Sequence, residues 1–153
     1  MNAIAQLLPA ENVRLDLEAT SKVRLFEALG ALFEANQGLA GRGIVDSLAA
    51  REKLGSTGLG QGIAIPHGRI RGLKAAVGAY ARLRTPIVFD APDGKPVAQV
   101  FVLLVPEQAT EQHLQLLSEL AQMFSDRAFR ERLGAATDAA AVHALFTGWR
   151  AGA

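Results

Sequence analysis

The sequence contains no cysteine, and this absence removes several classes of site at once. Thiol catalysis, disulfide scaffolds and cysteine-ligated zinc or iron–sulfur centres are all excluded. Aromatic residues make up only 6% of the 153 residues, so aliphatic side chains and alanine must fill most of the core. Half of the residues are apolar, which is enough for a sizeable core, and we expect a single domain over residues 1–153.

Long hydrophobic runs and targeting signals are also missing. The longest apolar run, residues 100–106, is far too short to cross a bilayer. Residues 1–9 lack the basic head and long apolar stretch of a secretory signal. We therefore expect a cytoplasmic protein with no membrane insertion.

Signals for metals and nucleotide cofactors are weak. The three histidines include no pair at the i, i+4 spacing that would favour a zinc site on a helix. The glycines of residues 58–62 follow a predicted helix and precede a predicted strand, which is the reverse of the dinucleotide-binding order. No Gly-Lys-Ser or Gly-Lys-Thr of a phosphate-binding loop is present. We expect neither a metal nor a cofactor.

The overall charge is close to neutral, at +1, but it is unevenly distributed. Residues 51–84 contain seven basic side chains and one acid, a charge of +6, so the remainder of the chain carries −5. This asymmetry suggests that the middle of the chain meets an anionic group, although a solvated basic surface is the simpler interpretation. Nucleic acid is not expected as a partner, because the balance is near neutral and no recognition motif is visible.

Hydrophobic periodicity predicts helices at both ends of the chain and strands between them. Residues 55–62 contain four glycines and are expected to form a loop, and Asp93-Gly94 is expected to be a tight turn. Strands are expected over residues 13–17, 63–65, 76–83 and 100–105. Helices are expected after caps at Thr20 or Ser21, over residues 42–53, and after caps at Thr110, Asp126 and Thr137.

Two details of this pattern bear on the architecture. Residues 100–105 are apolar on both faces, so that strand is expected at the centre of a covered sheet. The helix after Thr110 is expected to bury a stripe formed by Leu114, Leu117, Leu120, Ala121 and Phe124. Together these elements predict an α/β fold with three layers, in which a mixed β-sheet has helices on both faces.

The densest chemical signal is the segment 51–69, in which a glycine-rich loop and a short apolar strand lead to His67. A proline fixes the backbone before this histidine, and Gly68 lets another molecule approach closely after it. Arg51 and Arg69 can contact phosphate oxygens in a bidentate manner. Imidazole is a competent nucleophile near neutral pH, so the segment suits a histidine that accepts a phosphoryl group. An ordinary surface histidine is the competing interpretation.

Four other polar side chains either take part in the chemistry or have a purely structural role. Ser56 and Thr57 either hydrogen-bond an incoming phosphate or serve only as turn residues. His113 lies in the first turn of a predicted helix, where the helix dipole disfavours the imidazolium form and leaves a neutral ring able to donate to a phosphate. An exposed histidine without a function is the alternative there. His143 is expected to be structural, because its helix holds no other catalytic residue type.

The segment around His67 resembles a known signature. Residues 59–68 read LGQGIAIPHG and resemble the phosphohistidine motif of phosphotransferase-system enzyme IIA domains of the fructose–mannitol type, type 2. The nitrogen-regulatory enzyme IIA proteins of bacteria are the most similar subgroup. Further matches are residues 51–58 (REKLGSTG), 85–91 (TPIVFDA) and 103–106 (LLVP), with His113 and Leu114 downstream.

The resemblance implies a mechanism and partners. It implies that His67 accepts phosphate from a histidine-containing phosphocarrier protein, that His113 assists by hydrogen bonding, and that Arg51 lies near the phosphate. Arg69 replaces a lysine that many nitrogen-regulatory members carry directly after Pro-His-Gly. The implied role is regulation of target proteins, such as potassium-uptake or sensor-kinase components, through the phosphorylation state.

Two alternatives stay open. One is a sugar-specific enzyme IIA that passes phosphate on to a IIB domain for transport. The other is a docking module in which His67 is never phosphorylated. The presence of His67, His113 and Arg51 together disfavours the docking module, because a surface that only docks a partner does not need all three.

Overall fold

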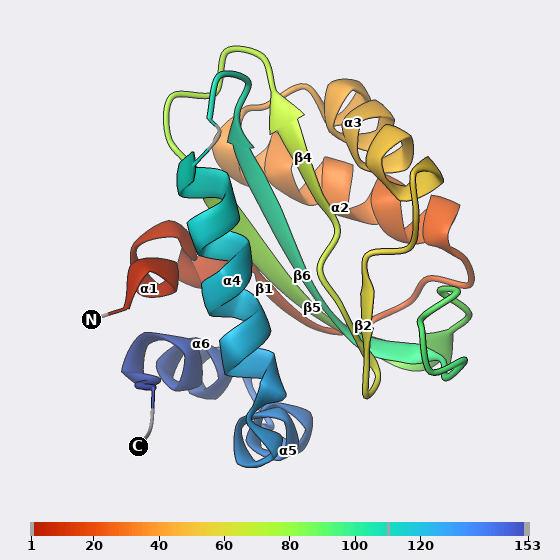
Figure 1. The fold of residues 1–153 in the computed structure, drawn as a ribbon, viewed down its shortest axis with the longest axis vertical. Helices are drawn as coiled ribbons and strands as arrows, with labels where there is room; N and C mark the ends of the chain where they lie inside the picture. Colours follow the sequence, from red (N-terminus) through yellow and green to blue (C-terminus); the bar gives the residue numbers. More distant parts are fainter. Residues whose placement is uncertain (1, 110, 152–153) are drawn as a thin grey trace.

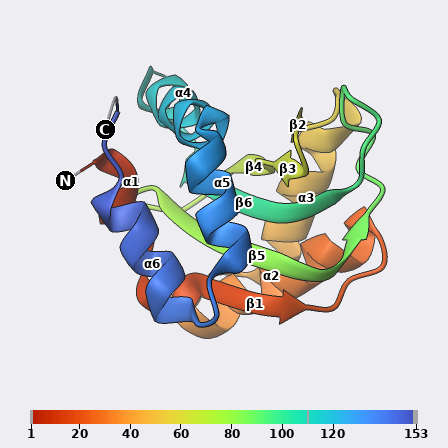
Figure 2. The same ribbon diagram turned by 90° about the horizontal axis from the view of Figure 1, so that it is seen from below.

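The computed structural model describes residues 2–109 and 111–151, and it has three layers (Figure 1). A mixed sheet lies between two helical layers, as the sequence predicted (Figure 2). The strands are β1 (Val13–Leu17), β2 (Gly58–Gly60), β3 (Ile63–Ala64), β4 (His67–Ile70), β5 (Val77–Ile87) and β6 (Val97–Pro106).

Strand β6 is the centre of the sheet. The strand order is β1-β5-β6-β3-β2, and β4 also pairs with β6, further along the edge that β3 occupies. The pairs of β6 with β3 and β4 are parallel, whereas its pair with β5 is antiparallel. Residues 100–105 are each at most 1% exposed, so the apolar run predicted to be central is covered on both faces.

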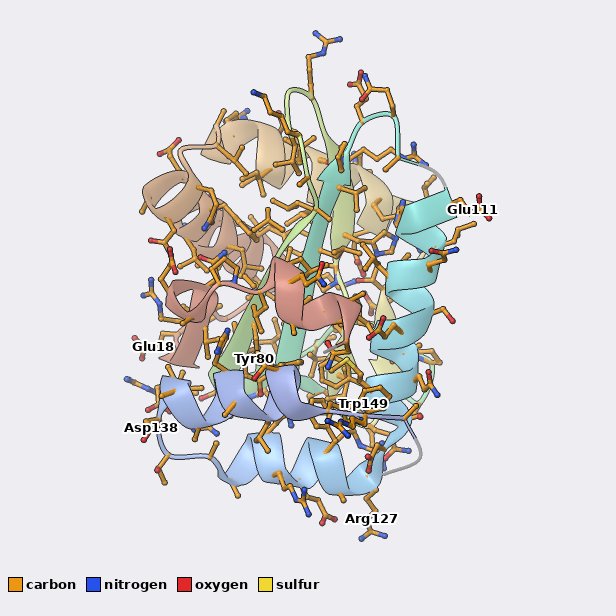
Figure 3. The ribbon with its side chains drawn as sticks, turned by 90° about the vertical axis from the view of Figure 1, so that its left-hand side faces the viewer. Glu18, Tyr80, Glu111, Arg127, Asp138 and Trp149 are labelled. Carbon is orange, nitrogen blue, oxygen red and sulfur yellow. The ribbon has the colours of Figure 1, made fainter. Side chains whose placement is uncertain are left out.

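Helices α2 (Lys22–Gln37) and α3 (Gly41–Lys53) cover one face of the sheet. The other face is covered by α1 (Ala3–Leu7), α4 (Glu111–Ser125), α5 (Arg127–Ala135) and α6 (Ala139–Gly148), the layer turned toward the viewer in Figure 3. A short 3₁₀ turn, η1 (Ala10–Asn12), leads into β1. No helix within the described residues is long and apolar enough to cross a membrane.

Local signals explain where the second helix begins and ends. The Ser21 hydroxyl accepts a hydrogen bond from the backbone N–H of Arg24 at 3.2 Å, which caps the N-terminus of α2. Gly38 ends the helix in the left-handed conformation, with φ of 69°. The apolar side chains spaced for a helix in this segment are all buried against the sheet: Leu25, Phe26, Leu29, Leu32 and Phe33.

Several sequence-based predictions need correction at the level of local structure. Residues 58–60 of the predicted loop form strand β2, and His67 itself begins a strand, β4, that was not expected. The helices α1 and η1 were also missed. The cap of α6 is Asp138, whose carboxylate accepts from the Ala141 N–H at 2.7 Å, and not Thr137. The predicted cap at Thr110 lies outside the described residues.

The buried stripe of α4 was predicted only in part. Leu120 and Phe124 are buried as expected, but Leu114 is 68% exposed. Ala121 is exposed as well, and Leu117 is only partly buried. Leu116 and Met123 are buried in their place. Helix α4 carries apolar residues on two adjacent faces, and helical spacing alone does not say which face meets the sheet.

The Arg82 side chain binds the C-terminal end of helix α5. Its guanidinium donates to the carbonyls of Leu133, Gly134 and Ala136, at 2.8, 3.2 and 2.7 Å, and so caps the C-terminus of α5. Replacing Arg82 with methionine keeps the apolar stem and leaves these carbonyls without the donor. We expect Arg82→Met to lower the free energy of unfolding by about 2 kcal/mol in urea denaturation.

Arg84, two residues along β5, is the matched control. It forms an ion pair with Glu18 at 3.0 Å, and the two side chains are 60% and 76% exposed. Exposed pairs of this kind contribute little, so Arg84→Met should change stability by less than about 0.5 kcal/mol. Equal losses from the two variants would contradict the capping role of Arg82.

Candidate active site

His67 lies where three segments that are distant in sequence meet. It is the first residue of β4, and its backbone is held beside Leu103 of β6. The last turn of α3 brings Arg51 to one side of the ring, and the first turn of α4 brings His113 to another. The ring is partly exposed, so it is fixed by the sheet and still open to a partner.

Two hydrogen bonds define the protonation state of the His67 ring. Nδ1 lies 2.9 Å from the carbonyl oxygen of Ile65, which only accepts, so Nδ1 carries the proton. Nε2 lies 3.2 Å from Nε of Arg51, which only donates, so Nε2 presents its lone pair. Both contacts are satisfied by the same neutral tautomer. The geometry therefore makes Nε2 the ring nitrogen that carries the lone pair.

The surroundings favour the neutral ring. Burial lowers the pKa of His67 below its ordinary value of 6.5, and the positive charge of Arg51 lowers it further. The hydrogen bond to Ile65 and the negative charge of Glu52 act in the opposite direction, but they do not outweigh the burial. At neutral pH the imidazole is thus uncharged and able to attack an electrophile.

His113 faces His67 edge to face, with the ring centroids 5.2 Å apart and the planes at 72°. Its pKa is also lowered, first by burial and then by the neighbouring His67, Arg69 and Arg51. Its Nε2 is buried and has no hydrogen-bond partner among the described residues. A buried ring nitrogen without a partner is costly unless a bound group satisfies it. The sequence predicted a neutral ring from the helix dipole, and burial favours the same neutral form.

The two arginines predicted at the site occupy different positions. Arg51 contacts His67 through Nε, and its Nη1 donates to the carbonyl oxygen of Gly55 at 2.9 Å. Arg69 is exposed, and its Nη1 donates to the carbonyl oxygen of Glu107 at 3.1 Å. Arg51 is therefore hydrogen-bonded to His67 directly, whereas Arg69 influences the site through its charge on His113.

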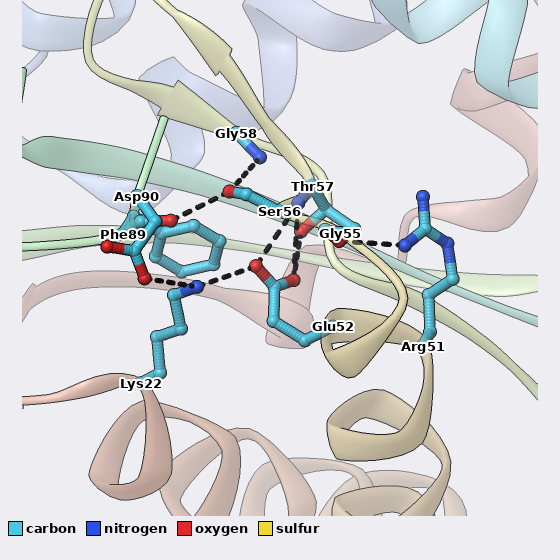
Figure 4. A network of polar contacts seen from close by, with 9 residues as sticks. All are labelled: Lys22, Arg51, Glu52, Gly55, Ser56, Thr57, Gly58, Phe89 and Asp90. Carbon is cyan, nitrogen blue, oxygen red and sulfur yellow. Dashed lines mark hydrogen bonds and ion pairs between the residues drawn. The ribbon is translucent and has the colours of Figure 1, made fainter. Parts of the chain in front are cut away.

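Ser56 and Thr57 lie beside the site, but their hydroxyl protons are already engaged. The Ser56 hydroxyl donates to the carbonyl oxygen of Phe89 at 2.7 Å, and the Thr57 hydroxyl donates to Glu52 at 2.7 Å. Both interactions shape the loop between α3 and β2 (Figure 4). These hydrogen bonds agree with the interpretation of Ser56 and Thr57 as turn residues. Their contact with phosphate stays a prediction.

Gly68 is required for packing. A side chain at this buried position would collide with the hydroxyl of Ser47 on α3 and lie 3.1 Å from its Cβ. The Ser47 hydroxyl in turn donates to the backbone carbonyl of Arg69 at 3.0 Å. Because Gly68 has no side chain, β4 can lie close to α3. This contact is on the face of the sheet opposite helix α4, which carries His113.

A cavity of about 400 Å³ opens next to His67. Leu59, Leu114 and Leu117 line it together with Arg51 and His67. Leu59 and Leu114 are 45% and 68% exposed, so exposed apolar side chains lie beside His67. A larger cavity, of about 810 Å³, lies between α4 and the segment 147–151, and its lining includes no histidine. Of these two cavities, only the smaller one is lined by His67 and Arg51.

The basic segment 51–84 does not form one surface. Arg82 caps α5, Arg84 pairs with Glu18, and Arg71 lies 3.7 Å from Glu107. Of the seven basic residues, Arg51 alone contacts His67. The prediction that the middle of the chain meets an anionic group therefore applies to the surface near Arg51. Arg69 contributes to that surface through its charge.

Some residues of the site were not found from the sequence. The Ile65 carbonyl, which orients His67, is a backbone group that carries no sequence signal. The side chain of Glu52 is buried although its two neighbours in the chain are charged. It is paired with Lys22, which is distant in the sequence, so this burial could not be predicted. His143, predicted to be structural, lies away from the site and donates through Nε2 to the Leu8 carbonyl at 2.9 Å.

The lowered pKa of His67 should affect both the titration of its ring and the pH dependence of stability. We expect the imidazole to titrate in an NMR experiment with a midpoint below pH 6.5. In the unfolded chain the ring binds its proton near 6.5, so this histidine contributes stability above that pH. The contribution is lost as the pH falls from 6.5 through the folded-state pKa. A midpoint at or above 6.5 would contradict the geometry.

Comparison with known proteins places this arrangement in a family. Residues 6–148 match the family model described as "Phosphoenolpyruvate-dependent sugar phosphotransferase system, EIIA 2". A "Nitrogen regulatory protein" of Pseudomonas aeruginosa is 41% identical over 152 residues, which cover 95% of each chain. The crystal structure of the nitrogen regulatory protein IIA-Ntr from Neisseria meningitidis is 52% identical, with a TM-score of 0.89 over 95% of this chain and all of that one.

The fold is shared more widely than the sequence. The crystal structure of IIA mannitol from Escherichia coli superimposes with a TM-score of 0.74 over 90% of this chain and 96% of that one, at 24% identity. That likeness concerns the fold, whereas the family model and the nitrogen regulatory relatives share the sequence as well. The chain belongs to the type 2 enzyme IIA family of the phosphoenolpyruvate-dependent sugar phosphotransferase system.

Proposed function

We propose that the protein is a cytoplasmic phosphohistidine carrier of a regulatory, nitrogen-related phosphotransferase system, a single domain that accepts its phosphoryl group on Nε2 of His67. The observation that carries the proposal is the neutral tautomer of His67, in which Nδ1–H donates to the Ile65 carbonyl and the Nε2 lone pair accepts from Arg51. A phosphorylated histidine-containing phosphocarrier protein is the proposed donor.

The transfer step is an in-line exchange between two imidazoles. The Nε2 lone pair of His67 forms a bond to phosphorus, the N–P bond of the donor breaks, and its electron pair returns to the donor ring. The Nδ1 proton stays on the His67 ring, and the Ile65 carbonyl stabilises the positive charge that the ring gains. Arg51 releases Nε2 and donates to the phosphoryl oxygens, and the unpartnered Nε2 of His113 is available to donate a further hydrogen bond.

The regulatory role is proposed over sugar transport because the similar relatives at 41% and 52% identity are nitrogen regulatory proteins. A phosphoryl group on His67 would add about 1.5 to 2 negative charges beside Arg51, by analogy with phosphate monoesters. Apolar residues around His67 offer the surface on which partners would sense that change. Potassium-uptake and sensor-kinase components are the proposed classes of target.

Intact-mass analysis tests the proposal. Wild-type protein is incubated with phosphoenolpyruvate, enzyme I and the phosphocarrier, and an acid-labile gain of one phosphate is the expected result. A chase with a fructose- or mannitol-type IIB domain then separates the two carrier roles: retention of the label supports the regulatory role, and its loss supports sugar transport. No label on this chain, with a competent donor confirmed on another enzyme IIA, would leave the docking module.

A further inference from the structure

An ionic cluster with a buried carboxylate at its centre lies beside the candidate active site, and it takes no direct part in the transfer step. The Glu52 carboxylate is the centre, and its side chain is only 8% exposed. It accepts hydrogen bonds from the Thr57 hydroxyl at 2.7 Å and from the Thr57 backbone N–H at 3.2 Å (Figure 4). Lys22, on α2, lies 2.8 Å away. A buried carboxylate persists only when it is paired and hydrogen-bonded in this way.

Lys22 is itself held in place. Its ammonium group lies 4.6 Å from the centre of the buried Phe89 ring and 3.3 Å from the carboxylate of Asp90. The Ser56 hydroxyl donates to the Phe89 carbonyl and accepts from the Gly58 N–H at 3.1 Å. The loop between α3 and β2 is thus tied both to α3 and to the segment that follows β5.

A continuous series of hydrogen bonds joins Glu52 to the nucleophile. Glu52 holds Thr57, whose carbonyl accepts from the Ile65 N–H at 3.0 Å. The carbonyl of the same Ile65 accepts from Nδ1 of His67 at 2.9 Å. Arg51, the preceding residue of α3, holds the other end of the loop through Gly55 while it contacts Nε2 of His67. Two adjacent residues of one helix turn therefore fix both sides of the imidazole.

We propose that Glu52 is a positioning residue for phosphoryl transfer: through Thr57 and Ile65 it holds the His67 ring in the orientation that presents Nε2. The inference rests on the proposed function for its kinetic consequence. Its structural consequence, the tautomer of His67, does not depend on any partner. Small displacements of a reacting group reduce rates strongly, so loss of this support should slow transfer while the donor still binds.

The test compares Glu52→Gln with wild type in two measurements. In rapid-quench transfer from the phosphorylated phosphocarrier, the maximal rate should fall by about tenfold, with the half-saturating donor concentration changed by less than about twofold. In long-range ¹⁵N NMR of the free protein, the His67 signals should move away from the pure Nδ1–H tautomer. Glu34→Gln is the matched control, because Glu34 also accepts from a backbone N–H, that of Gly41, but at the other end of α3.

A second pair of variants keeps the test decisive if Glu52→Gln does not fold. Thr57→Val removes the hydroxyl at nearly constant volume and should slow transfer, whereas Thr57→Ser retains the hydroxyl and should restore the rate. Wild-type rates and an unchanged His67 spectrum in folded Glu52→Gln or Thr57→Val would overturn the inference. If wild-type protein accepts no phosphate, the proposed function fails, and the NMR comparison still decides whether Glu52 orients His67.

Discussion

His67→Gln should abolish phosphate incorporation completely. The glutamine amide is close to imidazole in size and polarity, but its nitrogen lone pair is delocalised into the carbonyl and is not nucleophilic. His67 is partly exposed, and within the described part of the chain its ring hydrogen-bonds Arg51 and Ile65 alone, so the fold should survive the change. Intact mass after incubation with the complete donor system should show no acid-labile phosphate on the variant.

Two histidine controls sharpen this result. His143→Gln should label like wild type, because His143 contacts the Leu8 carbonyl in a different part of the molecule. His113→Gln should still label, but more slowly by about two orders of magnitude, since one stabilising donor to the phosphoryl group is lost. Full labelling of His67→Gln would move the acceptor elsewhere, with His113 the first candidate because its ring lies 5.2 Å away.

The overall architecture could be read from the sequence wherever the signal was local. The run 100–105 is apolar on both faces, and a strand with that pattern is stable only in the centre of a covered sheet. Ser21 marks the start of α2 by its own chemistry, as a hydroxyl cap. These features depend on neighbouring residues in the chain, so their prediction needed no knowledge of the fold.

The predictions that failed depend on distant contacts. Strand β4 has four residues, and its pairing with residues 103–106 of β6 makes it a strand; no local alternation reveals this. The same dependence hides Glu52. Its neighbours Arg51 and Lys53 suggest a solvated helix end, but its covered carboxylate is paired with Lys22, thirty residues earlier in the chain. The sequence named the side chains that meet at the candidate site, whereas the groups that orient them could not be predicted.

Arg51→Gln should reduce the rate of phosphoryl transfer by about 10²- to 10³-fold. Arg51 donates a hydrogen bond to Nε2 of His67, and an arginine donates to phosphoryl oxygens in a geometry that a neutral amide does not reproduce. The substitution also removes a charge that lowers the pKa of His67, so that pKa should rise and more of the ring should be protonated near neutral pH.

The two consequences of losing Arg51 separate with pH. Transfer measured at pH 8, where the His67 ring is neutral in both proteins, reports only the lost stabilisation of the phosphoryl group, and most of the reduction should remain there. Arg71→Gln removes an equal charge from the same basic segment, but Arg71 is 90% exposed and pairs with Glu107, so its rate should stay within about twofold of wild type. If Arg71→Gln slowed transfer as much as Arg51→Gln, the effect would come from net charge. A loss confined to Arg51→Gln and persisting at pH 8 would assign the effect to a guanidinium in contact with the reacting atoms.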